Sequence, residues 1–493
     1  MRAHFFLTMR SAAYCYLLVL AAAVLGIVGL LRLGSALPVP VPGAGVAVSH
    51  AVAAEVPAAQ GGSVLDSALA SLGQNSSGAL SRLFLQLLVI ISASRLMGAI
   101  FTRFGQPAVV GEMAAGILLG PSLFGLVAPD AFHFVFAAGS LDTLRLMSQV
   151  GVCLFMFCVG MEVDLGHVRN QARTAVMVSN SGILVPYFLG VSLAYFLYGQ
   201  YAQPGSTFLA FALFMGISMS VTAFPVLARI LQERNLTRTS LGATAITCAA
   251  MGDVTAWSIL AIVVAIVRAA SVGATILNLG LVAVFIALMA WGVRPVLLRW
   301  LGRSNVEEGE GLSKSVLVVV TCVVMGASLC SEIIGIHALF GAFLSGAIMP
   351  ESAGFRHKLA VRLENFSSVL LLPLFFVFVG LRTQVGLLSG AQGGLVCLLI
   401  ITVATVGKLG GSALPAWLCG MPGREALKLG ALMNTRGLME LIVLNLGYDL
   451  GILSPSIFAM LVIMALVTTM LTGPLLVLFG YRQPALTPAR SAA

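Results

Sequence analysis

The stretch 453–470, LSPSIFAMLVIMALVTTM, is apolar on every side of the helix that it would form. The stretch 313–330, SKSVLVVVTCVVMGASLC, has the same character. A helix needs about 20 mainly apolar residues to cross the hydrocarbon core of a bilayer. Strands of a transmembrane β-barrel instead alternate apolar and polar residues over about ten positions. These stretches therefore exclude a barrel and predict membrane-spanning helices.

The composition of the whole chain agrees with an integral membrane protein. Of 493 residues, 59% are hydrophobic and 9% are charged, against about 25% charged residues in ordinary soluble domains. The mean hydropathy is +1.03. The formal net charge is +9, but the 27 Lys and Arg residues are scattered over short loops. They form no basic stripe with aromatic residues between, so nucleic acid is not an expected partner.

Working outward from these stretches, the apolar segments between residues 82 and 480 predict an all-α membrane domain with thirteen spans. The predicted spans are 82–103, 107–127, 141–161, 173–199, 207–231, 241–268, 273–300, 314–333, 334–350, 360–382, 390–419, 425–449 and 453–480.

The residues before and after this domain have a different character. Residues 1–54 hold an apolar run behind Arg2 and Arg10, which fits either a signal sequence or an extra N-terminal helix. Residues 55–81 are predicted to be an extracytoplasmic linker, and residues 481–493 a short cytoplasmic tail. The tail is too short for a nucleotide-binding domain, so no nucleotide is expected.

The distribution of Lys and Arg predicts the orientation in the cell membrane, because cytoplasmic loops carry an excess of both. If the first span begins outside, the outside loops hold little beyond Arg268 and Arg382. The inside loops and helix ends then collect Arg103, Arg169, Arg173, Arg234, Arg238, Arg303, Lys314, Arg356, Lys358, Arg362, Arg424, Lys428, Arg482 and Arg490.

Thirteen spans divide into six, a linker span at 273–300, and six more. Corresponding spans lie seven apart, so the two halves cross the membrane in opposite senses, as in inverted-repeat transporters. The fifth span of each half is interrupted, by 218–225 (SMSVTAFP) and by 434–440 (NTRGLME). Two broken helices that cross near the midplane expose carbonyl groups and helix ends, which form a site for a small ion.

Asp253 is the strongest candidate for an ion-binding residue. It lies in the middle of the span 241–268, and no basic residue stands within two helical turns of it in the sequence. A carboxylate inside the membrane is costly and marks a functional site by default. A carboxyl group that holds either a proton or a monovalent cation, and never both, couples the two fluxes. Packing against Lys408 alone is the structural alternative.

Three other charged residues lie deep in predicted spans. Lys408 is the only lysine deep inside a span, away from the span ends, and either takes part in ion exchange or is a structural tether. Arg436 and Glu440 stand four residues apart, so they share one helix face and can neutralise each other and the helix ends at the break.

Several stretches together resemble the second family of monovalent cation:proton antiporters, which includes bacterial sodium/proton exchangers, potassium efflux proteins and plant cation/proton exchangers. The stretches are 106–112 (QPAVVGE), 120–122 (GPS), 218–231 (SMSVTAFPVLARIL), 252–257 (GDVTAW), 336–343 (IHALFGAF), 372–376 (LPLFF) and 434–441 (NTRGLMEL).

The resemblance implies a homodimer of two-domain protomers, in which a core domain moves like an elevator against a dimer domain. It implies that Asp253 binds the ion, Na⁺ or K⁺ as substrate, and that Lys408 is the basic residue opposite it. It also implies that Thr222, with Ser220 and neighbouring carbonyl groups of the first break, contributes ligands. No cofactor is implied, and the expected cellular role is pH homeostasis.

One position departs from the family's pattern. Electrogenic members carry two consecutive aspartates where this chain has Gly252 and Asp253. The missing carboxylate predicts electroneutral exchange of one proton for one cation. A potassium efflux transporter remains an alternative, and an intramembrane aspartyl protease that uses Asp253 and Asp449 is a remote one. The main prediction is a transporter that is not an enzyme.

Overall fold

The computed structural model describes residues 25–29, 31–33, 78–162, 172–237, 239–268, 272–303, 314–350, 355–388 and 390–481. Within these residues the protein is helical, and one isolated β-bridge joins Ala202 and Leu453. The predicted signal sequence or extra helix of 1–54 lies outside the described residues except for short helical pieces. Most of the predicted linker 55–81 and all of the predicted tail except Tyr481 also lie outside them.

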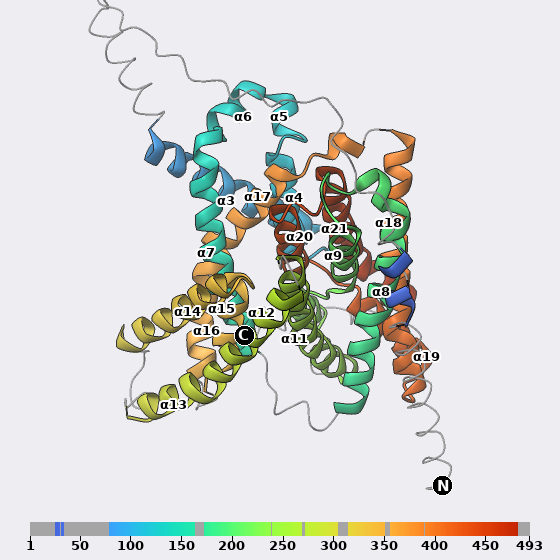
Figure 1. The fold of residues 1–493 in the computed structure, drawn as a ribbon. Coiled ribbons are helices and arrows are strands. Elements are labelled where there is room, and N and C mark those ends of the chain that lie inside the picture. Colours follow the sequence, from blue (N-terminus) through green and yellow to red (C-terminus); the bar gives the residue numbers. More distant parts are fainter. Residues whose placement is uncertain are drawn as a thin grey trace, which may run out of the picture.

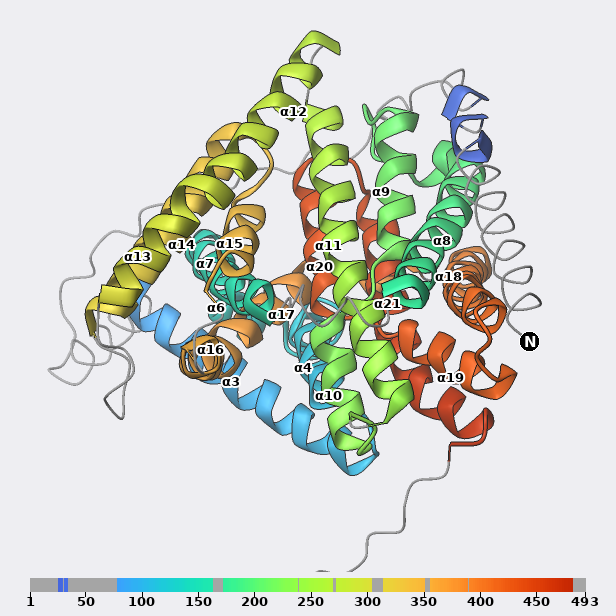
Figure 2. The ribbon, with the colours of Figure 1, turned by 90° about the horizontal axis from the view of Figure 1, so that it is seen from below.

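The helices form two bundles that lie side by side (Figures 1 and 2). The first, which we call the α4 bundle, contains α3 (Ala79–Arg103), α4 (Ala108–Leu119), α7 (Ala138–Glu162), α14 (Lys314–Ile334), α15 (Ala338–Ala347), α16 (Phe355–Phe366) and α17 (Leu372–Arg382). The second, the α9 bundle, contains α8 (Ala172–Tyr201), α9 (Phe208–Ser220), α10 (Phe224–Glu233), α11 (Ser240–Arg268), α18 (Ala391–Leu418), α19 (Gly423–Met433), α20 (Leu438–Asp449) and α21 (Pro455–Leu478).

Short elements and one long connection complete the fold. A tilted rod along the edge of the molecule joins the bundles (Figure 2). It consists of α12 (Val272–Ala287), the π-helical η2 (Leu288–Val293) and α13 (Arg294–Arg303). The short elements are α5 (Phe124–Val127), α6 (Pro129–Val135), η3 (Ser367–Leu371) and η4 (Val385–Leu388).

Ten spans in the described part of the chain are long and apolar enough to cross a membrane. Two shorter apolar helices, Ala338–Ala347 and Val369–Arg382, correspond to further predicted spans. The predicted span 425–449 consists of α19 and α20, which have 11 and 12 residues. The multi-pass helical architecture is therefore confirmed, and each predicted core range contains helix.

The predicted span 107–127 is not one continuous helix. Helix α4 ends at Leu119, and α5 starts only at Phe124. Gly120 and Pro121 cause this interruption, because a proline has no N–H group to continue the helical ladder. The hydroxyl of Ser122 in this turn donates a hydrogen bond to the Thr383 carbonyl at 2.7 Å, which ties the turn to the end of α17.

Glycines bring helices of the α4 bundle into backbone contact. A Cβ atom at Gly116 of α4 would lie 2.2 Å from the Phe376 carbonyl oxygen of α17. A Cβ atom at Gly346 of α15 would lie 2.1 Å from the Phe157 carbonyl oxygen of α7. Both distances are shorter than van der Waals contact, so only glycine fits. Small residues at helix interfaces let the backbones of membrane helices approach this closely.

Candidate functional site: two crossing helix breaks

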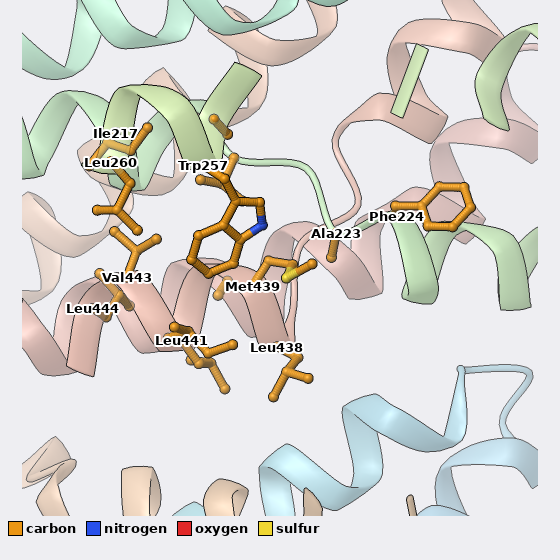
Figure 3. Close-up of a cluster of buried hydrophobic side chains, with 14 of the residues drawn as sticks. Ile217, Ala223, Phe224, Trp257, Leu260, Leu438, Met439, Leu441, Val443 and Leu444 are labelled. Carbon is orange, nitrogen blue, oxygen red and sulfur yellow. The ribbon is translucent and has the colours of Figure 1, made fainter. Parts of the chain in front are cut away.

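Two helix interruptions cross in the middle of the α9 bundle. The backbone leaves helical geometry at Val221–Ala223, between α9 and α10, and at Asn434–Gly437, between α19 and α20. The Ala223 N–H donates to the Thr435 carbonyl at 3.0 Å, so the two extended segments touch directly. Figure 3 shows this crossing, with Ala223 at the end of the first break, Phe224 at the start of α10, and Leu438 and Met439 after the second break. Both interruptions predicted from the sequence are confirmed.

Pro225 explains why the first break occurs where it does. It stands in the first turn of α10, where a proline's missing N–H group costs nothing, and it prevents α9 from continuing. Thr222 lies in the break, and its hydroxyl donates to the Met433 carbonyl at the end of α19, at 3.0 Å. The Ser220 hydroxyl donates back to Ile217 within α9, at 2.9 Å.

The second break is held by the hydroxyl groups of α21. The Thr469 hydroxyl accepts a hydrogen bond from the Arg436 N–H at 2.9 Å and lies 2.8 Å from the Arg436 carbonyl oxygen. The Asn434 side-chain amide donates to the Thr468 carbonyl at 3.4 Å. Buried backbone groups outside a helix need such partners, because no water satisfies them inside a membrane.

Two basic side chains cap the carboxyl end of α9. The guanidinium of Arg436 donates to the Ser218 carbonyl at 2.7 Å and to the Met219 carbonyl at 2.5 Å. The ammonium of Lys408 donates to the next carbonyl, that of Ser220, and to the Gly182 carbonyl of α8 at 2.8 Å. The last carbonyls of a helix carry partial negative charge, so these cations stabilise the broken end.

Arg436 and Glu440 form the predicted ion pair. Their side chains are fully buried, and the Arg436 Nη1 and Glu440 Oε2 atoms lie 3.2 Å apart. Glu440 also stands in the first turn of α20, where the partial positive charge of a helix start favours an anion. The second break thus contains two opposite charges in direct contact.

Asp253 is buried in the middle of α11, with 2% of its surface exposed. Helix α11 packs against α8, α9, α10 and α19, which places it beside both breaks. One turn after Asp253, the indole of Trp257 lies near Met439 at the start of α20 (Figure 3). Asp253, Arg436 and Glu440 all lie within electrostatic range of Lys408. The structure thus brings the predicted ion-site residues together.

Gly252 leaves space beside the candidate carboxylate. A Cβ atom at this position would meet only the Ser179 hydroxyl of α8, at 3.4 Å, which is an ordinary contact. Ser179 is buried, and its hydroxyl has no hydrogen-bond partner among the described residues. A methyl group is therefore sterically allowed at position 252, so backbone packing does not require glycine there.

A cavity of about 330 Å³ opens between the two bundles and reaches the crossing. Ala223 and Leu438, at the two breaks, form part of its wall, and charged side chains line its mouth. The lining residues are Arg95, Val109, Glu112, Phe155, Leu372 and Phe376 from the α4 bundle and Ala223, Pro225, Val226, Ala228, Arg229, Gln232 and Leu438 from the α9 bundle.

Several residues around this site are not evident from the sequence. Thr468 and Thr469 fix the second break, and the carbonyl of Gly182 holds Lys408. The signals were present as a polar run at 179–182 (SNSG) and as the threonines at 468, 469 and 472, each inside an apolar span. Serine and threonine are common in membrane helices, so these signals are weak without the tertiary contacts.

The chain belongs to the sodium/hydrogen exchanger family of transmembrane transporters, the monovalent cation:proton antiporters, because the family model matches residues 89–479. The resemblance inferred from the motifs is therefore confirmed. This family is one of transporters and not of enzymes, which excludes the protease alternative. Asp449, the second aspartate of that alternative, is paired with the Arg382 guanidinium at 2.7 Å.

The chain is 42% identical over 395 residues to the Na(+)/H(+) antiporter NhaS4 of Synechocystis, covering 79% of this chain and 95% of that one. It is 37% identical to cation/H(+) antiporter 20 of Arabidopsis thaliana and 31% identical to K(+)/H(+) antiporter 1 of Saccharomyces cerevisiae. These matches cover 80% and 84% of this chain but only 48% and 49% of the relatives, so the chain spans about half their length.

The fold also resembles a solved structure, that of the sodium proton antiporter MjNhaP1 from Methanocaldococcus jannaschii. The TM-score is 0.56 at 15% identity, and the match covers 81% of this chain and all of that one. At this identity the likeness concerns the fold alone.

Proposed function

We propose that this protein exchanges a monovalent cation, Na⁺ or K⁺, for protons across a cytoplasmic membrane. The observation that carries the proposal is the position of Asp253, a buried carboxylate beside two crossing helix breaks. The cavity between the bundles leads from the surface to that crossing. Asp253 binds either the cation or a proton, and Thr222 and carbonyl groups of the first break complete the cation's coordination.

The contacts of Ser220 and Lys408 refine these roles. The Ser220 hydroxyl and carbonyl both have hydrogen-bond partners, so Ser220 becomes a cation ligand only if these contacts rearrange. Lys408 is fixed on two carbonyl oxygens, which leaves its charge at the end of α9. Its charge acts on Asp253 through space and favours release of the cation.

Electroneutral exchange follows from the residue before Asp253. Position 252 carries no side chain, so no second carboxylate directly precedes Asp253, and backbone carbonyls hold Lys408. A single carboxylate that alternates between one proton and one monovalent cation moves no net charge in a complete cycle. The rate of exchange is then independent of the membrane potential.

Pairs of helix contacts support the proposed thirteen spans and the inverted repeat. Spans seven apart in the chain make the same neighbours: α3 packs on α4 as α14 packs on α15, and α8 packs on α9 as α18 packs on α19. The turns before α4 and α15 also match, because Gly105 and Gly335 both have positive φ angles, 71° and 95°. The glycines Gly111 and Gly116 of α4 have the same spacing as Gly341 and Gly346 of α15.

The two bundles suggest how alternating access is achieved. Their interface contains the cavity, and the ion site lies wholly in the α9 bundle. Movement of the α9 bundle along the α4 bundle carries the site from one side to the other, which is the proposed elevator motion. We propose further that the protein is a homodimer with a cytoplasmic C-terminus and serves pH homeostasis. A potassium efflux transporter that exchanges K⁺ for protons is the alternative function.

Liposomes with an imposed pH gradient test the proposal. Lumenal pH is followed after addition of Na⁺, K⁺ or Li⁺ to liposomes that contain the wild type, Asp253→Asn or the exposed-acid control Asp142→Asn. We expect cation-driven proton movement in the wild type and the control, and a loss of at least a hundredfold in Asp253→Asn. Proton movement that survives in Asp253→Asn refutes the assigned role of Asp253, and its absence with every cation refutes the exchange.

The same liposomes test the stoichiometry. The initial rate is compared with the membrane potential clamped at zero and with an inside-negative potential. Equal rates agree with one-for-one exchange, whereas a rate that follows the potential contradicts it. Competition at one carboxylate also requires the apparent cation affinity to fall about tenfold for each unit of acidification, where the group is mainly protonated.

A further inference from the structure

Ion pairs between side chains join the two bundles at the end of their interface opposite the cavity. Arg382, at the end of α17 in the α4 bundle, donates to the Asp449 carboxylate of α20 at 2.7 Å. The same nitrogen lies 2.6 Å from the side-chain oxygen of Asn445. Arg145 of α7 lies 3.6 Å from the other carboxylate oxygen of Asp449. We call Arg145, Arg382, Asn445 and Asp449 the outer cluster.

The outer cluster is more than an exposed surface ion pair. The side chains of Arg382 and Asp449 are only 17% and 19% exposed. The Arg382 guanidinium also lies 4.2 Å from the ring centroid of Phe378 and 5.2 Å from that of Tyr448. Partial burial, a charge-assisted hydrogen bond and contact with aromatic rings each strengthen such a pair relative to an exposed one.

Arg382 is also one of the two arginines at the C-terminal, outward-facing ends of predicted spans. The other, Arg268 of α11, donates to the Gly335 carbonyl between α14 and α15 at 3.1 Å, which again joins the α9 bundle to the α4 bundle. Positive charge on the outer side works against the predicted topology. Both exceptions thus lie at contacts between the bundles, which gives each a physical reason for its position.

The interface between the two bundles is held together by the ion pairs of the outer cluster at one end. At the other end it opens as the cavity. Gln232 and Arg229, near the end of α10, line the cavity, whereas Arg382 and Asp449 lie at the opposite ends of α17 and α20. Under the predicted topology the cavity faces the cytoplasm and the outer cluster faces outside.

We infer that the Arg382–Asp449 pair, supported by Arg145, is an outer lock that holds the transporter in its inward-open state and separates when the site opens outward. This inference rests on the alternating access of the proposed function. Because α17 and α20 belong to different bundles, movement of one bundle along the other pulls Arg382 away from Asp449. Weakening the pair therefore shifts the population toward the outward-open state.

Accessibility of the cavity tests the lock without requiring transport. Gln232, which lines the cavity, is replaced by cysteine, and its labelling by a membrane-impermeant maleimide is measured from the cytoplasmic face of inverted vesicles. The chain without Gln232→Cys gives the background from its own cysteines. Arg382→Gln and Asp449→Asn are added singly and together, and Lys428→Gln is the control, because Lys428 pairs with Glu425 inside α19 at 2.8 Å.

We expect either lock variant to slow the labelling of position 232 by roughly tenfold, since a charge-assisted pair favours one state by about that factor. The double variant labels no more slowly than a single one, because both changes break the same pair. The Lys428→Gln control labels at the wild-type rate. Monodisperse elution of each variant in size-exclusion chromatography verifies that it is folded.

Unchanged labelling in folded Arg382→Gln and Asp449→Asn variants overturns the lock, as does a double variant whose effect is the sum of the single effects. Transport measured on the same variants separates the two proposals. If the wild type shows no cation-driven proton movement while the lock variants still slow labelling, the exchange fails and the lock stands. If the wild type exchanges ions and labelling is unaffected, only the lock fails.

Discussion

The two helix breaks have similar backbone geometry, but different side chains satisfy their free carbonyl groups. At the first, the free carbonyls of α9 are capped by the charged groups of Arg436 and Lys408. At the second, the Met433 carbonyl of α19 receives the neutral hydroxyl of Thr222. The backbone crossing is thus common to both breaks, and the side chains around it determine which helix end lies beside fixed positive charge.

The helices behind the breaks differ in the same way. Helix α11, beside the first break, contributes the buried carboxylate of Asp253. Helix α21, behind the second, contributes the hydroxyl of Thr469, which binds the Arg436 backbone. The first break and its neighbour thus hold the carboxylate that we propose binds a proton and a cation in turn. The second break and its neighbour hold groups that fix geometry.

Among the changes that test this comparison, removal of the Arg436 guanidinium is expected to have the largest effect on stability. Arg436→Met leaves Glu440 buried without its ion partner and two α9 carbonyls without donors, which costs about 3–5 kcal/mol. The midpoint of thermal aggregation, followed by size-exclusion chromatography of the detergent-solubilised protein, measures the loss. The double variant Arg436→Met/Glu440→Met should recover part of it. A midpoint equal to that of the exposed control Arg103→Met would contradict the buried ion pair.

Two glycine contacts in the α4 bundle, one from each half of the chain, are expected to respond alike to substitution. In this they differ from the two breaks. Gly116→Ala and Gly346→Ala place a Cβ atom 2.2 Å and 2.1 Å from carbonyl oxygens of the facing helices. Each is expected to destabilise the protein by about 1–3 kcal/mol, because the backbones must separate. Gly326→Ala and Gly394→Ala, which meet nothing within 4 Å, serve as controls in the same thermal assay. Substitutions at 116 and 346 that are as mild as these controls would rule out the tight crossings.

Two isosteric threonine changes should give the smallest but most selective effects. Thr469→Val removes an acceptor from the Arg436 N–H and should cost about 1–2 kcal/mol of stability. Thr222→Val removes a hydroxyl at the first break and should weaken cation affinity about tenfold, with a smaller loss of stability. Aggregation midpoints and the cation dependence of exchange in liposomes measure both variants. A pattern in which Thr469→Val weakens cation affinity more than Thr222→Val would reverse the assigned roles of the two breaks.

The class of the fold and the positions of both breaks were predictable because they depend on local properties of the chain. Long apolar segments become membrane helices whatever their neighbours are, and Pro225 interrupts its helix by its own covalent structure. The ion pair of Arg436 and Glu440 was predictable for the same reason, since four residues is the spacing of one helix face.

The contacts of Lys408 were not predictable. Its partners, the carbonyls of Gly182 and Ser220, lie 226 and 188 residues away in the chain. The roles of Thr468 and Thr469, whose carbonyl and hydroxyl groups bind residues of the second break, were not predictable either. Such contacts depend on which helices become neighbours, and a carbonyl group, which every residue has, leaves no signal in a sequence.

Local properties of the sequence were therefore enough to identify a multi-pass helical transporter of the cation:proton exchanger family and the charged residues inside its spans. Only the tertiary structure decided how these charges are arranged: the caps of α9, the hydroxyl support of the second break, the cavity on one side of the crossing and the Arg382–Asp449 pair at the other end of the interface. The difference lies in the sequence separation over which each interaction acts. Hydrophobicity and backbone geometry act within one segment, whereas ion pairs and hydrogen bonds between helices exist only after the bundles have packed.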